Sequence, residues 1–349
     1  MHIALTADPE LAVPPLHYGG IERIVDMLAH GLTQRGHRVT LFANADSTSA
    51  GALVPWPGHS NRSTVDTLRN AATLARHTAS SRFDVVHSFS RLATLLPILA
   101  WRQPKLMTYQ RTISRRSVQL GHHLSRGTLA FSAISRFMML PVADVGNWHV
   151  VSNGVPLTSY RFVANPPAGA PLVFLGRIEA IKGPHLAIEV ARRAGLPLVI
   201  AGTVPDAQRG WFERHVAPHI DGTAVRYAGP IDDGQKNVLL GAARALLMPI
   251  LWEEPFGIVM AEAMACGTPV IGFARGALPE VVENGVTGMV VADLDEMIAA
   301  VSALARIDRR AVRSRVERLY SDAAVVEGYL AVYEAMLGIN PSAQPGPTE

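Results

Sequence analysis

Short apolar runs alternate along the chain with segments in which apolar residues recur at helical spacing. The runs HIALTA and RVTLFA are typical of buried parallel strands. Between them, residues 21–36 place Ile, Val and Leu every three or four positions and end at Gly36, where a helix C-terminus is expected. Later strands are indicated at DVVHSF, KLMTYQ and LAFSAIS. This alternation predicts a parallel sheet covered by helices on both faces.

The alternation restarts after a stretch rich in Pro and Gly at residues 152–171. The new strands are expected at LVFLGRI, PLVIAG, VRYAGPI, ARALLMPI and PVIGFA, with a helix at HLAIEVARRAG. We therefore expect two successive doubly wound α/β domains. The expected bounds are 1–163 and 164–320, then a final helix over 321–337 and a disordered tail over 338–349.

Composition excludes several classes of protein. Of the 349 residues, 48% are apolar and 17% charged, which is enough apolar material for two cores and too much for a disordered chain. The single cysteine, Cys266, excludes a disulfide scaffold and fits a reducing compartment. No apolar run approaches the roughly 18 residues that span a bilayer, and MHIALTADPE does not resemble a signal peptide. We expect a cytoplasmic protein.

Charge is distributed unevenly between the two halves. Residues 1–165 hold 16 basic and 8 acidic residues, whereas residues 166–349 hold 16 and 21. No acidic residue lies between Asp84 and Asp144. This balance suggests that the first half meets something anionic.

The strongest chemical signal is EEPFGIVMAEAMACGTPVI, at residues 253–271. Pro255 is well placed to open a helix, and Glu262 would lie two turns deeper, on the same face as Glu254. A carboxylate in that position could hold vicinal hydroxyls, as acidic residues hold a ribose. Two solvated glutamates are the alternative, but the apolar neighbours disfavour it. Free N–H groups at the helix start, which attract phosphate or sugar oxygens, would be those of Phe256, Gly257 and Ile258.

The second signal is FLGRIEAIKGPHLAIEVA, at residues 174–191. Arg177 and Lys182 lie in a strand-to-helix loop with glycines beside them, and a guanidinium plus an ammonium suits a diphosphate. Lys182 is one of only three lysines beside 29 arginines. The alternative is two exposed charges on a turn.

The third signal, YGGIER at residues 18–23, is weaker. Gly19 and Gly20 could pass close to phosphates at the head of the first helix, although paired glycines are common in turns. Neither G-x-G-x-x-G nor G-x-x-x-x-G-K-[ST] occurs in the sequence.

With this order and spacing of motifs, the chain resembles the retaining nucleotide-sugar glycosyltransferases of glycosyltransferase family 4, from residue 1 to about residue 335. The resemblance implies the GT-B architecture, in which two Rossmann-like doubly wound domains face a central cleft. It also implies that the C-terminal domain binds the nucleotide sugar, that the N-terminal domain binds the acceptor, and that the last helix crosses back to the first domain.

The resemblance implies a role for each motif residue. Arg177 and Lys182 would neutralise the departing diphosphate, Glu254 would hold hydroxyls of the transferred sugar, and Glu262 would bind the ribose. These roles make Arg177, Lys182 and Glu254 the expected catalytic residues. The expected donor-binding residues are Gly19, Gly20, Gln110, Phe256, Gly257, Ile258 and Glu262.

Two positions depart from the family pattern. Many members have T-x-H after the fourth strand, where LMTYQRTI places Gln110, or Tyr109 or Arg111 if the register shifts by one residue. The second family histidine, after DVVH, is also missing, and Phe89 lies near that place. His87 itself is expected to be a satisfied histidine at a strand end.

We expect no metal, because the sequence has no paired Cys and no Glu-x-x-His set to hold one. We expect no cofactor, because the nucleotide sugar is a co-substrate. Asp293 and Asp295 match a D-x-D motif but lie at the start of an expected helix, where Asp is an ordinary first-turn residue. The adjacent His122 and His123 would splay apart on a helix. Cys266 is expected to be inert in the core.

The resulting prediction is a retaining, metal-independent hexosyltransferase of polysaccharide biosynthesis, with a preference for UDP-sugars. Its acceptor would be a hydroxyl of a glycan, a lipid-linked or a small-molecule substrate, and no nucleic-acid partner is expected. A GT-B nucleotide-sugar epimerase and a non-catalytic nucleotide-sugar-binding protein are the alternatives.

Residues 113–127 form a basic segment that can be drawn as a helix, with Ile113, Val118, Leu120 and Leu124 to one side. Its basic face is either simply solvated or meets an anionic surface. In the second case the enzyme would be peripheral at the inner face of the cell membrane.

Overall fold

The computed structural model describes residues 1–16 and 19–339, which form two compact units. Unit 1 comprises residues 1–153 and the chain from Asp322, and unit 2 comprises Gly154–Ser321. The division after Asn153 precedes the expected boundary at residue 163. Backbone bonds explain the difference, because the N–H of Val163 donates to the carbonyl of Cys266 at 3.0 Å, within unit 2. The expected disordered tail lies almost wholly outside the described residues.

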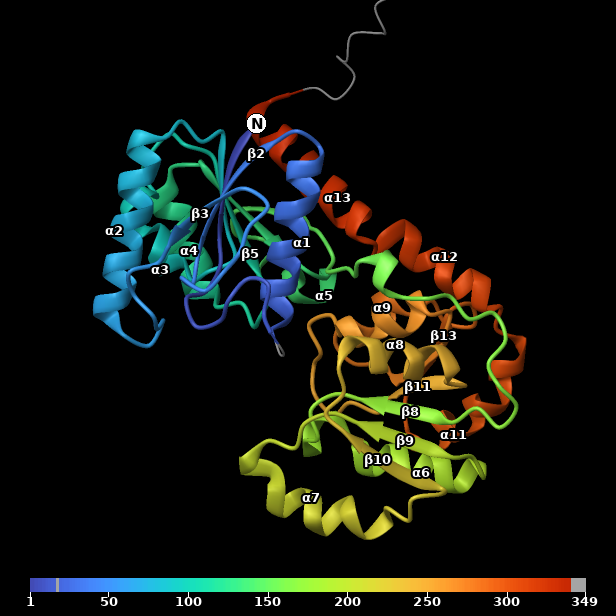
Figure 1. Ribbon diagram of the computed structural model, residues 1–349. Coiled ribbons are helices and arrows are strands. Elements are labelled where there is room, and N and C mark those ends of the chain that lie inside the picture. The colour runs from blue at the N-terminus through green and yellow to red at the C-terminus, as the bar shows by residue number, and fades with distance from the viewer. Residues whose placement is uncertain (17–18, 340–349) are drawn as a thin grey trace, which may run out of the picture. The chain divides into compact units, whose positions relative to one another are not determined.

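Unit 1 is built on a seven-stranded parallel sheet in the order β3-β2-β1-β4-β5-β6-β7 (Figure 1). Strand β1 is central and apolar and pairs on either side with β2 and β4. The strands are β1 (His2–Thr6), β2 (Arg38–Ala43), β3 (Ala52–Pro55), β4 (Val85–Ser88), β5 (Lys105–Tyr109), β6 (Leu129–Ala133) and β7 (Asn147–Val150).

Helices pack on the unit 1 sheet, and the two ends of the unit's chain meet there. Figure 1 shows α13 running beside α1, and both belong to one apolar core. A Cβ at Gly31 of α1 would lie 2.4 Å from Val326 Cγ2 of α13, so a glycine inside α1 permits this close approach. The helices are α1 (Gly20–Gln34), α2 (Thr64–Ser80), α3 (Leu92–Leu95), α4 (Arg115–Ser125), α5 (Arg136–Met139) and α13 (Asp322–Leu337).

Unit 2 repeats this architecture with a six-stranded parallel sheet in the order β10-β9-β8-β11-β12-β13 (Figure 1). Helix α6 packs with α11, and α9 packs with α8 and α12. The strands are β8 (Leu172–Leu175), β9 (Leu198–Ala201), β10 (Val225–Gly229), β11 (Ala245–Met248), β12 (Val270–Phe273) and β13 (Gly288–Val291). The helices are α6 (Pro184–Ala194), α7 (Arg209–His215), α8 (Asp233–Ala242), α9 (Ile258–Ala265), α10 (Leu278–Val281), α11 (Leu294–Ala303) and α12 (Arg309–Leu319).

The predicted strands are confirmed, and the structure adds β3, β7 and β13. All three lie at a sheet edge. Strands β3 and β7 have exposed ends and no fully buried residue, so they lack the continuous apolar run that marks a central parallel strand. Gly36 has φ +79° just after α1, as its place at a helix end predicted.

The inward face of α4 agrees with the expected one at Val118 and differs at Leu120 and Leu124. The helix buries Val118, Gly121 and Ser125, whereas Leu120 and Leu124 are 49% and 38% exposed. Gly121 is the reason, because even a Cβ there would lie 3.0 Å from a side-chain carbon of the core. The helix turns this glycine inward and leaves two leucines beside its basic residues.

Among the residues that the structure describes, no helix combines the length and the apolar character needed to cross a bilayer.

Candidate active site

The main candidate site of unit 2 lies where β8 and β11, paired neighbours in a parallel sheet, reach their carboxyl ends. Ligands of open α/β sheets bind at this edge. The loop after β8 carries Arg177 and Lys182, and the loop after β11 carries Trp252 and Glu254. The two loops are tied together, because the N–H of Leu251 donates to the carbonyl of residue 181 at 2.7 Å.

Lys182 and Glu254 form the centre of this site. Lys182 Nζ lies 2.5 Å from Glu254 Oε2, and both side chains are largely buried. Trp252 Nε1 donates to the same oxygen at 3.1 Å, and the ammonium lies 4.6 Å from the centroid of the Trp252 ring. No hydrogen bond or ion pair between described residues reaches Oε1 of Glu254. One oxygen is thus fixed by the protein and the other is available to a ligand.

Gly183 explains how the loop comes so close to the sheet. It has φ +75°, and a Cβ there would lie 2.1 Å from the carbonyl oxygen of Pro249. Only glycine combines that backbone conformation with that approach. The glycine beside Lys182 is therefore needed for packing, whatever else the motif binds.

Arg177 does not join the Lys182–Glu254 pair. Its guanidinium forms an ion pair with Glu179 at 3.0 Å and is 48% exposed. The structure therefore leaves Arg177 at the surface of the loop, where it can still reach an anion.

The second motif glutamate, Glu262, lies on α9 and is 8% exposed. Its Oε1 accepts hydrogen bonds from Lys236 Nζ at 2.5 Å and from the Tyr160 hydroxyl at 2.8 Å. Sequence reasoning missed both donors, as well as Trp252. The scarcity of lysine that drew attention to Lys182 applies equally to Lys236, and it was the available signal.

The helix after Glu254 begins later than expected. It starts at Ile258, not at Pro255, because Gly257 at the N-cap has φ +78°. Glu254 therefore precedes the helix and does not share a helical face with Glu262, which corrects the expectation. Phe256 is buried against Tyr320, with ring centroids 5.5 Å apart, so Phe256 could offer a ligand only its backbone.

In unit 1, Gly19 and Gly20 precede and open α1. A Cβ at Gly19 would lie 2.7 Å from Pro15 and 2.8 Å from Glu22 Oε2. This crowding gives Gly19 a packing reason that needs no ligand. Tyr18 of the same motif lies outside the described residues.

Gln110 follows β5 and forms a reciprocal amide pair with Asn153. Each amide nitrogen donates to the other's oxygen, at 2.9 and 2.8 Å. Tyr109 instead packs near Phe131, with centroids 6.3 Å apart, and Arg111 is exposed. Of these three neighbours, Gln110 is the one that links β5 to the segment after β7.

A second polar cluster, which the sequence analysis did not identify, lies at the carboxyl edge of the unit 1 sheet. Asp8, just after β1, is 6% exposed, and its Oδ1 has no hydrogen-bond partner. Burial raises the pKa of Asp8, and burial together with the field of Asp8 raises the pKa of Glu22. Arg111 lies 3.6 Å from the other oxygen of Asp8. A buried carboxylate oxygen without a donor is suited to accept a hydroxyl.

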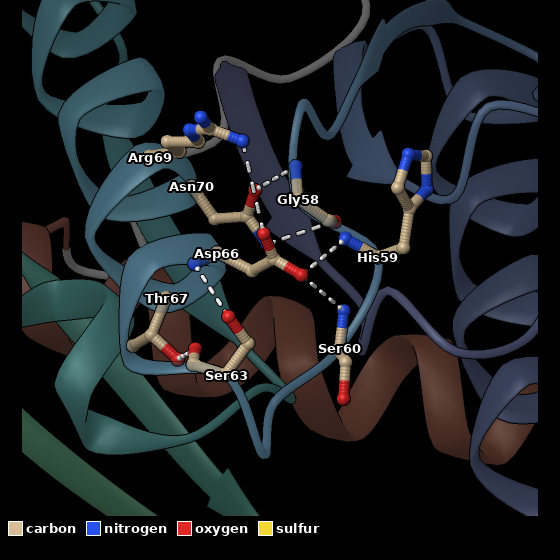
Figure 2. Close-up of polar contacts among 8 residues, drawn as sticks. All are labelled: Gly58, His59, Ser60, Ser63, Asp66, Thr67, Arg69 and Asn70. Atoms are coloured by element: carbon tan, nitrogen blue, oxygen red, sulfur yellow. Dashed lines mark hydrogen bonds and ion pairs between the residues drawn. The ribbon is translucent and has the colours of Figure 1, made fainter.

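The loop at residues 58–63 contributes to this edge and is held by α2, as Figure 2 shows. Asp66 accepts the backbone N–H groups of His59 and Ser60, both at 3.2 Å, and Asn70 bonds to both backbone polar groups of Gly58. The loop so fixed presents Asn61, whose amide and backbone both donate to Glu10.

Three other candidate residues have structural roles. His87 bonds to Tyr333 and Thr108, both at 2.6 Å, and burial holds its pKa well below the usual value, which confirms a satisfied strand histidine. Asp293 caps α11, as predicted. Burial raises the pKa of the Cys266 thiol to about 12, so this buried thiol is unreactive. No group of three or more His, Cys, Asp or Glu suited to a metal occurs among the described residues.

Family descriptions match most of the chain in two consecutive parts. Residues 18–159 match "Glycosyltransferase Family 4" and residues 161–315 match "Glycosyl transferases group 1". The two matches meet within the segment that joins the two units.

Curated relatives agree with these matches. A phosphatidyl-myo-inositol mannosyltransferase of Mycolicibacterium smegmatis is 28% identical over 97% of this chain and 95% of its own length. An alpha-maltose-1-phosphate synthase of Mycobacterium tuberculosis is 30% identical over 73% of this chain and 69% of its own. A glycogen synthase of M. tuberculosis is 36% identical over 50% of this chain, and the match spans 44% of that enzyme's length.

Solved structures share the fold at low sequence identity. A sucrose-phosphate synthase from Thermosynechococcus elongatus superposes with a TM-score of 0.78 at 21% identity, covering 97% of this chain and all of the other. Anabaena HepE, in complex with UDP-glucose, superposes with a TM-score of 0.69 at 16% identity, covering 96% of this chain and all of the other. The chain therefore belongs to the glycosyltransferases of group 1 and family 4, and its two parallel α/β sheets have the GT-B fold.

Proposed function

We propose that the protein is a retaining hexosyltransferase that takes its sugar from a nucleoside diphosphate. The observation that carries this proposal is the Lys182–Glu254–Trp252 cluster at the carboxyl ends of β8 and β11. It combines a fixed ammonium, suited to phosphate, with one carboxylate oxygen available to a sugar hydroxyl. Family membership makes a sugar nucleotide the ligand that uses both.

Lys182 serves the leaving diphosphate. An ammonium has three N–H donors, and one of them is used on Glu254, so two are left for phosphate oxygens. Arg177, at the surface of the same loop, adds a second positive charge that can leave Glu179 for the diphosphate. Charge that develops on the diphosphate is thereby stabilised by groups already in place.

The transfer proceeds on one face of the sugar. The bond from the anomeric carbon to the diphosphate oxygen breaks, and a bond from that carbon to the acceptor oxygen forms. The proton of the acceptor hydroxyl passes to the departing diphosphate oxygen, so the protein supplies no base. Glu254 Oε1 accepts a sugar hydroxyl, helped by backbone N–H groups at residues 256–258, and Glu262 holds the ribose.

The acceptor is bound by unit 1 in this proposal. Asp8 and Glu22 there are buried carboxylates. Gly19, Gly20 and Gln110, also of unit 1, contribute to donor binding in this proposal, as the family resemblance implies. UDP-sugars are our preferred donors, which agrees with the UDP-glucose held by HepE. The product belongs to polysaccharide or glycolipid biosynthesis, as for the relatives whose names include glycogen and phosphatidylinositol.

We also propose that the protein associates peripherally with the anionic inner face of the cell membrane. Helix α4 exposes Leu120 and Leu124 beside basic residues, which is the composition of an interfacial helix. One charge of this basic segment does not contribute, because Arg115 is paired with Asp144. Arg116 remains exposed on this face.

The decisive experiment measures donor binding and transfer in matched variants. UDP, GDP, ADP and dTDP sugars are screened by thermal shift, and a donor at 100 times its dissociation constant stabilises by about 2.7 kcal/mol. Lys182→Ala and Arg177→Ala should each lower turnover by about a hundredfold, since the loss of such a contact raises the activation free energy by about 3 kcal/mol. Arg192→Ala, an exposed arginine of α6, is the control and should turn over normally. Normal turnover in both site variants would refute the proposal.

Two further measurements separate the alternatives. Incubation of the donor without acceptor leaves the sugar unchanged apart from slow hydrolysis, whereas an epimerase would convert it. Activity should also survive EDTA, and a complete loss restored by Mg²⁺ or Mn²⁺ would contradict metal independence.

A further inference from the structure

The carboxylate of Glu262 is fixed at one oxygen by two donors from different parts of unit 2. Lys236 reaches it from α8, and Tyr160 reaches it from the segment that precedes β8. Both donors bond to Oε1, at 2.5 and 2.8 Å. No hydrogen bond or ion pair between described residues reaches Oε2.

The three side chains of this cluster are buried, so the hydrogen bonds to Glu262 are shielded from water. Tyr160 is 7% exposed, and the side chains of Lys236 and Glu262 are nearly as buried. Burial alone would lower the pKa of Lys236, but Glu262 and Asp233, which lies 3.0 Å away, raise it above its ordinary value. The ammonium is therefore charged at neutral pH and compensates the buried carboxylate.

The same construction occurs at the other motif glutamate. Glu254 Oε2 receives Lys182 and the indole N–H of Trp252, and Lys182 lies over that indole ring. At Glu262 the lysine likewise lies over the ring of the tyrosine, 5.8 Å from its centroid. Two of the three lysines of the chain thus pair with an aromatic donor on one oxygen of a glutamate. The repetition indicates that these donors orient the carboxylates in addition to packing locally.

A glutamate held at one oxygen can offer only the other. An unrestrained glutamate carboxylate rotates about the Cγ–Cδ bond, and it loses this conformational entropy when it binds a ligand. Two donors on Oε1 remove that freedom in advance, which is the benefit of preorganisation.

We propose that Lys236 and Tyr160 are positioning residues that orient Glu262 so that Oε2 receives the vicinal hydroxyls of the donor's ribose. The inference rests on the proposed function and extends it to residues that do not touch the ligand. Discrimination between a ribose and a 2′-deoxyribose depends on this orientation, because a positioned carboxylate left without its hydroxyl is an unpaired polar group.

The test is the ratio of dissociation constants for UDP and 2′-deoxy-UDP, measured by calorimetry on the full chain. GDP and 2′-deoxy-GDP, or the ADP pair, replace them if the nucleotide screen selects that base. The wild type should prefer the ribonucleotide by at least about tenfold. Lys236→Met should weaken binding of the ribonucleotide by about tenfold and reduce the preference to nearly one. Tyr160→Phe removes only a hydroxyl. It should weaken binding of the ribonucleotide by about threefold and lower the preference for the ribonucleotide by about threefold.

Two controls distinguish positioning from a merely structural role. Asp233→Asn removes the other partner of Lys236 and should leave the ratio unchanged. In a Glu262→Ala background, Lys236→Met should cause no further loss, since Lys236 acts through Glu262. Circular dichroism confirms folding of each variant.

The outcomes separate this inference from the proposal beneath it. If Lys236→Met and Tyr160→Phe bind both nucleotides more weakly but keep the wild-type ratio, the two residues are structural and the inference is wrong. If the wild type binds UDP and 2′-deoxy-UDP equally, the ribose role of Glu262 is wrong. If no nucleoside diphosphate binds at all, the proposed function itself is refuted.

Discussion

A buried lysine predicts an unusual pH dependence of stability. Lys105 opens β5 and has no solvent exposure. Its ammonium donates to the backbone carbonyls of Trp101 and Gln103, at 2.8 and 2.5 Å, and forms no ion pair with a described carboxylate. Burial lowers the pKa of Lys105 from 10.5 to about 8. The charge is therefore held in the folded state at a cost.

The sign of the effect follows from proton linkage. Between pH 8 and pH 10.5 the unfolded chain keeps the proton that the folded chain has lost, so the free energy of unfolding rises with pH. With pKa values of about 8 folded and 10.5 unfolded, raising the pH from 7 to 9.5 adds about 2 kcal/mol.

The Cys266 thiol opposes this rise. Its pKa is raised from 9.0 to about 12, so the folded state keeps a proton that the unfolded chain loses, and about 1 kcal/mol is lost by pH 9.5. Cys266→Ala removes the opposing contribution and is the appropriate background for the measurement.

The assay is urea unfolding of Cys266→Ala at pH 7 and at pH 9.5, followed by circular dichroism. The free energy of unfolding should be about 2 kcal/mol higher at pH 9.5. Lys105→Met in the same background should lose this increase, whatever its own stability at pH 7. An equal increase with and without Lys105, or no increase in Cys266→Ala, would refute the reasoning.

Three further predictions concern packing and the membrane. Arg309 is buried and donates to three backbone carbonyls and a threonine hydroxyl within 3.1 Å, so Arg309→Met should cost about 3 kcal/mol of stability in a thermal melt. An unchanged melting temperature would show that the backbone carbonyls bonded to Arg309 do not need this donor for stability. Gly183→Ala should cost about 3 kcal/mol, because φ +75° and a 2.1 Å clash with a carbonyl combine, whereas Gly195→Ala has φ +65° in open space and should cost about 1 kcal/mol. Equal costs in urea unfolding would contradict the clash. Arg116→Glu should weaken binding to anionic liposomes by about 30-fold, since two unit charges contribute about 2 kcal/mol. Co-sedimentation that is equal for neutral and anionic liposomes would exclude the membrane contact.

Periodicity predicted the central strands of both sheets because parallel strands buried on both faces must be apolar throughout. It missed β3 and β7, whose partly exposed residues at a sheet edge carry no such constraint. It also placed Leu120 and Leu124 on the buried side of α4, where Gly121 packs instead, since a glycine gives no apolar signal.

By itself, the sequence determined the family and the motif residues, because spacing along one loop or one helix is local information. Arg177, Lys182, Glu254 and Glu262 were found in this way. It also placed the start of α9 three residues too early, because Pro255 favours a helix start while the left-handed backbone of Gly257 prevents it there.

Only the tertiary structure decided which side chains hold the two glutamates. Tyr160 and Glu262 are 102 positions apart, and Lys182 and Glu254 are 72 apart. Contacts over such separations are set by strand order and by close approaches such as that at Gly183, which no local pattern encodes. The structure also gave each carboxylate one occupied and one available oxygen. That distinction depends on where a lysine and an aromatic donor meet in space, so it emerges only when the sheet has brought the loops together.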